Sequence, residues 1–217
     1  MLRDKRVVGT HHGASAIRPV LVLLMTDAPW CVPTIDNQYS NKRIMAKEKH
    51  GGAAKTNVAR LLDKAGIAYE LIPYEVDENN LAANHVAAEL GEDIARVFKT
   101  LVLKGEFPGR NAANSNAAGH FVCVVPGDGV VDLKKAAKAA GAKKADLIPM
   151  KELLPLTGYI RGGCCPIGMK KPFPTFFHST ALDFEEIYVS AGQRGLQLKI
   201  NSRALIDFVG AEVVDLL

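Results

Sequence analysis

Residues 158–171 read GYIRGGCCPIGMKK and interrupt an otherwise regular succession of apolar patterns. This segment, called the glycine loop below, holds four glycines and one proline. Glycine permits positive φ and close backbone approach, whereas Pro166 has a fixed φ and no amide donor. The exposed amides of a Gly-Gly turn suit a carbonyl, a carboxylate or a phosphate. The loop therefore indicates either a tight surface turn or a binding segment carried by a rigid scaffold.

Regular apolar patterns on both sides of the glycine loop predict interleaved helices and strands. Val58, Leu61 and Leu62 recur at helical spacing, and Gly66 is a helix stop. The continuous apolar run FVCVV at 121–125 is typical of a buried strand. Short connections favour a mixed sheet in one domain, α/β or α+β. We expect helices near 58–65, 86–90, 133–140, 151–156 and 205–209, and strands near 69–75, 100–103, 120–125, 173–177, 185–189 and 196–200.

The first 54 residues show no sustained period and differ from the rest. We expect an N-terminal extension over 1–54, either disordered or packed on the surface, and a domain over 55–217. Met45 precedes a polar segment and is an alternative translation start. The apolar run at 16–25 is broken by Arg18 and Pro19 and is too short to span a bilayer, so we expect no membrane association.

Composition is that of an ordinary globular protein: 217 residues, 48% hydrophobic and 23% charged. The formal charge of +4 fits contact with a polyanion without requiring it. The cysteines at 31, 123, 164 and 165 form no CxxC and have no histidine at metal-ligand spacing. We therefore expect no metal site, disulfide framework or cofactor, and reduced thiols in a cytoplasmic protein.

Four segments together carry a family resemblance. They are VFKTLVL at 97–103, DLKKAAKAAGAKK at 132–144, the glycine loop, and STALDFEEIYVSAGQRGLQ at 179–197. In this order and spacing they resemble the YbaK/EbsC family of Cys-tRNA(Pro) deacylases, relatives of the freestanding prolyl-tRNA editing domains. The resemblance covers residues 56–217. It implies a barrel-like mixed sheet flanked by helices.

The resemblance implies a catalytic lysine and an amide-lined loop. Lys99, in the FK dipeptide, matches the family's essential lysine. It would hold the 3′-terminal phosphate or ribose of the tRNA, or the oxyanion that develops when the ester is attacked. The alternative is a solvent-facing strand lysine. Gly162 and Gly163 match the family's GG-x-x-P loop and would supply backbone amides to the oxyanion.

Two positions depart from the family pattern. Many relatives have serine where Cys165 precedes Pro166, and this thiol raises the competing hypothesis of an enzyme nucleophile. Relatives also carry an aromatic residue that residues 80–84 lack, which leaves amino-acid selectivity open. For Tyr74 and Ser179, a core or edge tyrosine and a turn cap are the alternatives. By resemblance, the substrate-binding candidates are Tyr74, Thr100, Cys165, Pro166, Ser179 and Asp183.

A lysine-rich helix face is the candidate RNA contact. Lys134, Lys135 and Lys138 lie on the outer face of a helix that Asp132 would cap. Such a face is ordinarily solvated, but with a tRNA substrate it suits phosphate contacts. Arg194, in a predicted hairpin turn, is a further phosphate-binding candidate.

The resemblance therefore implies a trans-editing deacylase that hydrolyses Cys-tRNA(Pro). The substrate's own thiol would attack its ester, which agrees with the lack of a visible nucleophile triad. Two alternatives stay open: hydrolysis of another mischarged amino acid such as alanine, and an inactive module that binds tRNA or a synthetase. Mischarged tRNA(Pro) and prolyl-tRNA synthetase are the expected partners.

Overall fold

The computed structural model describes residues 55–78, 80–107 and 119–217. These residues belong to one compact unit of mixed α/β structure. The expected extension over 1–54 and the alternative start at Met45 lie outside the described residues. The boundary at residue 55 therefore stays a prediction.

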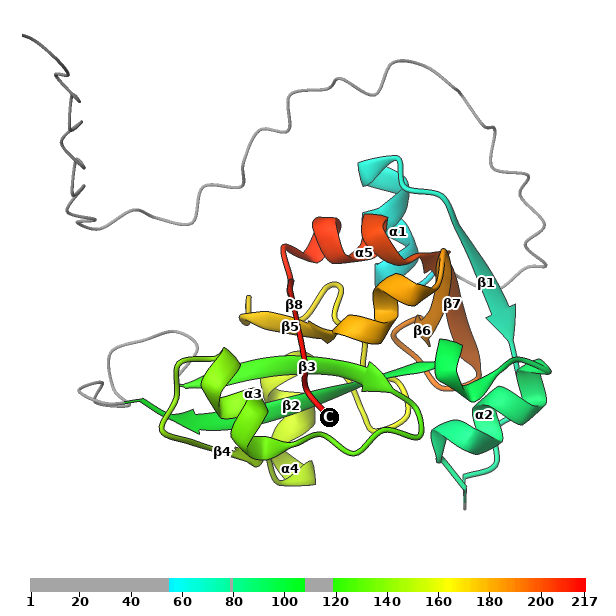
Figure 1. The fold of residues 1–217 in the computed structure, drawn as a ribbon. Coiled ribbons are helices and arrows are strands. Elements are labelled where there is room, and N and C mark those ends of the chain that lie inside the picture. The colour runs from blue at the N-terminus through cyan, green and yellow to red at the C-terminus, as the bar shows by residue number, and fades with distance from the viewer. Residues whose placement is uncertain (1–54, 79, 108–118) are drawn as a thin grey trace, which may run out of the picture. The chain divides into compact units, whose positions relative to one another are not determined.

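The strands form two sheets (Figure 1). An antiparallel three-stranded sheet has the order β1-β7-β6, with β1 Tyr69–Pro73, β7 Leu196–Asn201 and β6 Glu186–Ser190. A five-stranded sheet has the order β4-β2-β3-β5-β8, with β4 Lys144–Leu147, β2 Phe98–Glu106, β3 His120–Pro126, β5 Thr175–His178 and β8 Glu212–Val214. The pairs β2–β4 and β2–β3 are antiparallel, whereas β3–β5 and β5–β8 are parallel.

The expected mixed α/β class is confirmed, but the described strands do not close into a barrel. One parallel bridge, Val97 to Tyr188, links the two sheets. Strands β1, β4 and β8 remain at sheet edges, so the hydrogen-bond ladder does not run around a closed ring. The barrel expected from the resemblance is replaced by two joined sheets.

All five predicted helices are present among the described residues, and their ends have local causes. Gly66 ends α1 with a φ of 69°, and the Asp132 carboxylate accepts bonds from the amides of Lys134 and Lys135 at the start of α3. No described helix has the length and apolar character needed to cross a bilayer. The helices are α1 Asn57–Ala65, α2 Ala83–Leu90, α3 Leu133–Ala139, α4 Met150–Thr157 and α5 Ser202–Val209, with short 3₁₀ turns η1 Ile94–Arg96 and η2 Ser179–Asp183.

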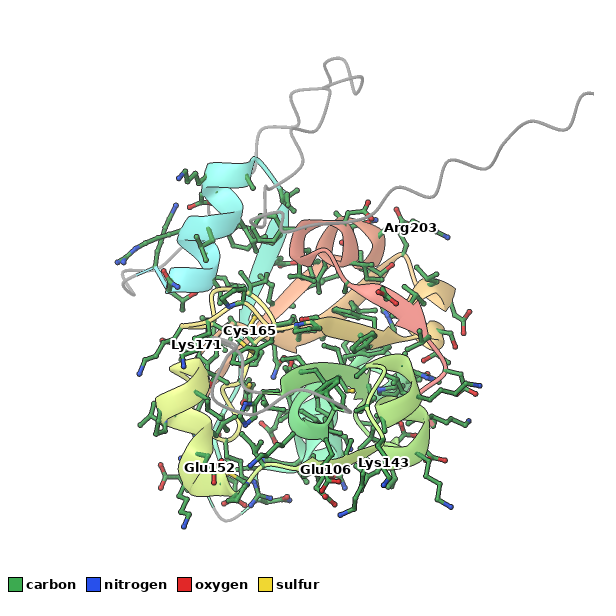
Figure 2. The ribbon with its side chains drawn as sticks, turned by 90° about the vertical axis from the view of Figure 1, so that its left-hand side faces the viewer. Glu106, Lys143, Glu152, Cys165, Lys171 and Arg203 are labelled. Carbon is green, nitrogen blue, oxygen red and sulfur yellow. The ribbon has the colours of Figure 1, made fainter. Side chains whose placement is uncertain are left out.

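Strand β3 is buried on both faces, as its apolar run predicts. Phe121 and Cys123 pack in the core cluster that includes α3, while Val122 and Val124 pack in the cluster that includes the glycine loop. Figure 2 shows α3 and the α4 helix, which carries Glu152, on opposite sides of these strands. The glycine loop therefore lies on a well-packed sheet, away from α3.

Candidate active site

A pocket of about 670 Å³ lies along the free edge of β2. Strand β2 pairs with β3 along its length, but with β4 only from Leu103 to Glu106. The outer edge at residues 98–101 is thus open. The volume of the pocket suits a small ligand or a side group of a larger one. The lining of this β2-edge pocket includes Leu81–Asn84, Val97–Val102, Gly127, Asp128, Leu147, Ile148, Met150, Leu153, Arg161, Gly162, Cys164, Ser190 and Gln197.

Lys99 and Thr100 line the same pocket from opposite faces of β2. Successive strand side chains alternate between faces, and the pocket wraps around the free edge. Lys99 is half-buried, and its Nζ donates a hydrogen bond of 2.9 Å to the Gly127 carbonyl. Burial lowers the pKa of Lys99, and the nearby Asp128 carboxylate partly opposes this shift. The structure thus places the Lys99 ammonium on the pocket wall.

Two buried polar atoms in the pocket have no hydrogen-bond partner among the described residues: Thr100 Oγ1 and Gln197 Oε1. An unsatisfied buried group costs about 1–3 kcal/mol, so a ligand that supplied the missing partner would gain binding free energy at these atoms. Ser190 lies opposite Gln197 in the β6–β7 ladder. Sequence reasoning missed Ser190 and Gln197. The sequence feature that could have identified them is a pair of polar residues, one in each strand, on the two sides of the glycine-containing β6–β7 turn.

The glycine loop reaches the pocket through Gly162 and is held by the β6–β7 turn. Gly162 has a φ of +82°, and its amide has no acceptor among the described residues. The Gly163 amide already donates to the Ile160 carbonyl at 3.0 Å. A Cβ at Gly163 would lie 3.2 Å from the Gln193 backbone, so glycine favours the close approach of these two backbone segments. Of these two amides, the Gly162 amide is therefore the one available to a ligand.

Arg194 joins the β6–β7 turn to the glycine loop. Its Nε donates a 2.9 Å hydrogen bond to the Arg161 carbonyl, and its guanidinium lies 3.7 Å from the Glu78 carboxylate. The Arg194 stem also covers Gly162. This arginine, an RNA-contact candidate from the sequence, has structural contacts beside the pocket.

The two adjacent cysteines occupy different environments. Cys164 lines the pocket, whereas Cys165 is fully buried in the core cluster that also contains Val122 and Val124. Burial raises the pKa of Cys164 to about 12 and also raises the pKa of Cys165. Pro166 lines a separate hollow of about 360 Å³. A reactive thiolate needs the opposite conditions, so this geometry offers no support for an enzyme thiol nucleophile.

Three other substrate-binding candidates lie outside the lining of the β2-edge pocket. Tyr74 is half-buried after β1, and its amide donates to the Gly195 carbonyl at 3.0 Å. Ser179 and Asp183 are exposed at the two ends of η2. The residue preceding η2 is His178, so Ser179 does not occupy the cap position considered for it.

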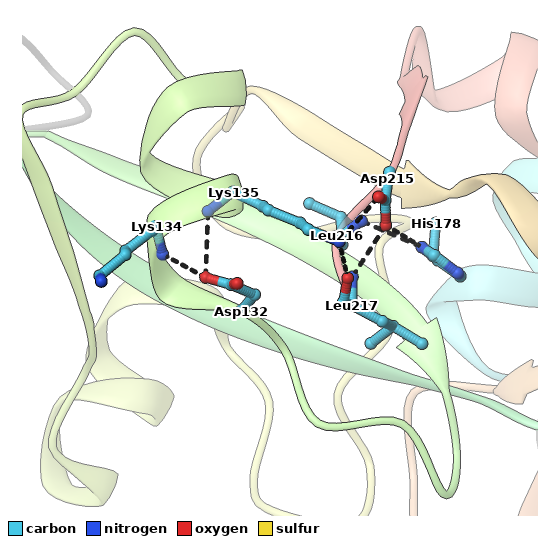
Figure 3. A network of polar contacts seen from close by, with 7 residues as sticks. All are labelled: Asp132, Lys134, Lys135, His178, Asp215, Leu216 and Leu217. Carbon is cyan, nitrogen blue, oxygen red and sulfur yellow. Dashed lines mark hydrogen bonds and ion pairs between the residues drawn. The ribbon is translucent and has the colours of Figure 1, made fainter.

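The α3 lysines line no part of the pocket, and one of them is engaged elsewhere (Figure 3). Lys135 Nζ lies 2.7 Å from the Asp215 carboxylate and also donates to the Leu217 carbonyl. Lys134 and Lys138 are exposed. Lys135 is therefore part of a local network that anchors the segment after β8.

Across residues 55–78, 80–107 and 119–217, no group of three or more His, Cys, Asp or Glu side chains is placed to hold a metal ion. In the same ranges, no histidine lines the β2-edge pocket. The arrangement instead offers an ammonium group, a free backbone amide and unpartnered oxygen atoms in a partly apolar pocket. The ammonium group and the amide can bind and polarise a carbonyl oxygen, and the unpartnered oxygen atoms can accept hydrogen bonds from a ligand.

Comparison with known proteins identifies the family. The model of the aminoacyl-tRNA editing domain family matches residues 77–208. A protein of Enterococcus faecalis, named as a candidate Cys-tRNA(Pro)/Cys-tRNA(Cys) deacylase, is 40% identical over 172 residues, which cover 79% of this chain and 98% of that one. The chain therefore belongs to the aminoacyl-tRNA editing domain family, and the resemblance expected from the sequence is confirmed.

More distant matches include another protein sequence and two solved structures, and the two structures share the fold. An uncharacterised protein of Bacillus subtilis is 24% identical over 139 residues, 64% of this chain and 82% of its own. The solved structure of a hypothetical protein covers 73% of this chain and 97% of its own, with a TM-score of 0.63 and 24% identity. That of a candidate trans-editing enzyme for prolyl tRNA synthetase covers 75% and 98%, with a TM-score of 0.61 and 23% identity.

Proposed function

We propose that this protein is a trans-editing deacylase that hydrolyses the ester of cysteine mischarged on tRNA(Pro). The observation that carries the proposal is the β2-edge pocket of an editing-family domain, in which Lys99, the Gly162 amide and two unpartnered oxygen atoms meet. Gln197 Oε1 and Thr100 Oγ1 can accept hydrogen bonds from the α-ammonium group of an aminoacyl ester. The apolar lining accommodates a small side chain.

The proposed chemistry uses the substrate's thiol, because the described lining offers no histidine base, and its one thiol, Cys164, is buried and has a raised pKa. The cysteinyl sulfur attacks its own ester carbonyl, the bond to the ribose oxygen breaks, and the thiol proton passes to that oxygen. Water then opens the cyclic thioester to free cysteine. Lys99 and the Gly162 amide stabilise the negative charge on the carbonyl oxygen.

Selectivity is assigned to the wall formed by residues 81–84. Cysteine and proline are similar in size, and discrimination by size alone is weak, so a second pocket is needed to remove the error. This wall lacks the aromatic residue that relatives carry, and it lines the pocket directly. Alanine thus remains the alternative substrate. Alanine has no thiol, so its removal would need a water nucleophile.

An inactive tRNA-binding or synthetase-binding module is the second alternative. The retained Lys99 and Gly162 in one pocket favour an enzyme. As parts of the same proposal, the protein works in the cytoplasm and meets its substrate near prolyl-tRNA synthetase.

The test is a panel of tRNA(Pro) species charged with cysteine, serine, alanine or proline. We expect fast hydrolysis of the cysteine ester and far slower hydrolysis of the serine ester, because a hydroxyl group is a poorer nucleophile than a partly ionised thiol. Comparable rates on serine and cysteine would exclude the thiol-assisted chemistry. Preferred hydrolysis of the alanine ester would replace cysteine as the substrate.

A further inference from the structure

The glycine loop lies in a long stretch without carboxylates. Residues 153–182 contain no Asp or Glu, but they contain Arg161, Lys170 and Lys171. All three cations are exposed. The ion pairs found among the described residues involve other cations, such as Lys135 and Lys144. This segment therefore presents three exposed cations, none of which forms an ion pair with a described carboxylate.

The three cations follow the loop outward from the pocket. Arg161 lines the β2-edge pocket beside Gly162. The Lys170 stem covers Gly158, with its Cγ 3.2 Å from where a Cβ would stand, and its Nζ lies 3.4 Å from the Leu154 carbonyl. Lys171 lines the separate hollow of about 360 Å³. Figure 2 shows Lys171 on the side of the molecule that carries α4, and Lys143 away from it.

Apolar surface lies between and beside these charges. The hollow next to Lys171 is lined by Pro166, Ile167, Pro172 and Phe173, among others. Ile160 and Leu154 are large apolar residues that are 44% and 50% exposed. Single-stranded nucleic acid binds where cations face its phosphates and apolar or aromatic groups pack against unstacked bases. This surface has both components, and Arg161 also lines the β2-edge pocket.

We propose that this surface, defined by Arg161, Lys170, Lys171 and the hollow beside Lys171, binds the single-stranded 3′ end of the tRNA. Arg161 contacts the phosphate nearest to the ester, Lys170 and Lys171 contact phosphates further along, and an unpaired base packs in the hollow. The inference rests on the proposed function, because the ester in the β2-edge pocket sets the direction of the strand. It places the RNA path over the glycine loop and away from α3.

The test compares Lys170→Gln/Lys171→Gln with Lys143→Gln/Arg203→Gln, which removes the same charge from exposed positions elsewhere (Figure 2). Two substrates are used: full-length Cys-tRNA(Pro) and 3′-O-cysteinyladenosine, which lacks the strand. We divide the KM for full-length Cys-tRNA(Pro) by the KM for 3′-O-cysteinyladenosine. We expect this ratio to be about tenfold higher in the Lys170→Gln/Lys171→Gln variant than in the wild type. The slope of the logarithm of tRNA affinity against the logarithm of salt concentration should also become shallower by about 1.4. Each single-strand phosphate that a cation neutralises adds roughly 0.7 to this slope.

The control pair should leave both the KM ratio and the salt dependence unchanged. An unchanged ratio in the Lys170/Lys171 variant, or an equal rise in both pairs, overturns the proposed path. Binding of a single-stranded RNA that ends in CCA and carries no amino acid tests the surface without catalysis. Fluorescence anisotropy measures this binding. If the wild type hydrolyses no ester, but the Lys170→Gln/Lys171→Gln variant binds this RNA more weakly and the control variant does not, the deacylase function is wrong and the binding surface is supported.

Discussion

The Lys99 ammonium group experiences two opposing effects inside the pocket. Burial disfavours its charge, whereas Asp128 favours it, and the Gly127 carbonyl accepts a hydrogen bond of 2.9 Å from its nitrogen. These contacts hold the amine in one position at the pocket wall, and the Lys99 side chain contributes little to the packing of the core. The residue can therefore be removed without collapsing its surroundings.

We expect Lys99→Ala to slow deacylation by roughly a hundredfold or more, the usual effect of removing one preorganised electrostatic contact. The melting temperature should stay close to that of the wild type. Lys104→Ala is the matched control, because Lys104 is an exposed lysine on the same strand. Near-normal turnover by a folded Lys99→Ala protein would remove this lysine from the catalytic site.

Cys165→Ser tests the thiol hypothesis at the residue scale. The side chain is fully buried in the core, so the new hydroxyl group should cost about 1–3 kcal/mol of folding free energy. We expect the folded fraction to keep the wild-type kcat, as measured by single-turnover deacylation at a temperature well below the transition. Cys164→Ser, at the pocket lining, serves for comparison. A folded but inactive Cys165→Ser protein would favour an enzyme nucleophile over the substrate's thiol.

At the scale of elements, the end of β5 holds the segment that follows β8. The Leu216 amide donates a 3.0 Å hydrogen bond to His178 Nδ1, which requires an unprotonated nitrogen (Figure 3). Burial is the largest cause of the lowered pKa of His178; Lys135 lowers it further, and Asp215 and Asp183 oppose the shift. The folded state therefore takes up a proton at His178 less readily than the unfolded state.

This difference in the His178 pKa predicts a pH-dependent stability. The stabilisation should be complete above the ordinary histidine pKa of about 6.5 and decrease as the pH falls towards the lower folded-state pKa. Melting temperatures between about pH 7.5 and 5 should decline more steeply in the wild type than in His178→Asn, which keeps an acceptor but does not titrate. Equal slopes for both proteins would show that other groups control the acid sensitivity.

For the whole molecule, the packing of the β6–β7 turn on the glycine loop builds the pocket. Gly163 admits the Gln193 backbone, Arg194 bonds to the Arg161 carbonyl, and Gln197 enters the pocket just after the turn. The two joined sheets carry these parts without barrel closure, which leaves the edge of β2 open to a ligand.

Residues 1–44 show none of the periodic apolar pattern that builds a core, so a protein that starts at Met45 should retain its melting temperature and its deacylase activity. Thermal unfolding and single-turnover assays of the shortened and full-length chains measure both. A decrease of several degrees would show that the leader stabilises the domain.

The amino-acid sequence by itself determined the order of helices and strands, since their signals are local. Gly66 permits the left-handed helix end, Asp132 caps α3, and the FVCVV run needs cover on both faces. Some short elements escaped it: β4 and β8 are too brief for a periodic pattern. Pro172 and Pro174 explain why β5 begins later than the apolar run suggested.

Only the tertiary structure decided which candidate residues share a pocket. It brought Lys99, Thr100 and Gly162 together, added Ser190 and Gln197, and placed Cys165 in the core. These positions come from segments far apart in the chain, and their meeting depends on how β2, the glycine loop and the β6–β7 hairpin pack. A residue's neighbours along the sequence report its local conformation, whereas its partners in a site are set by the packing of the whole domain.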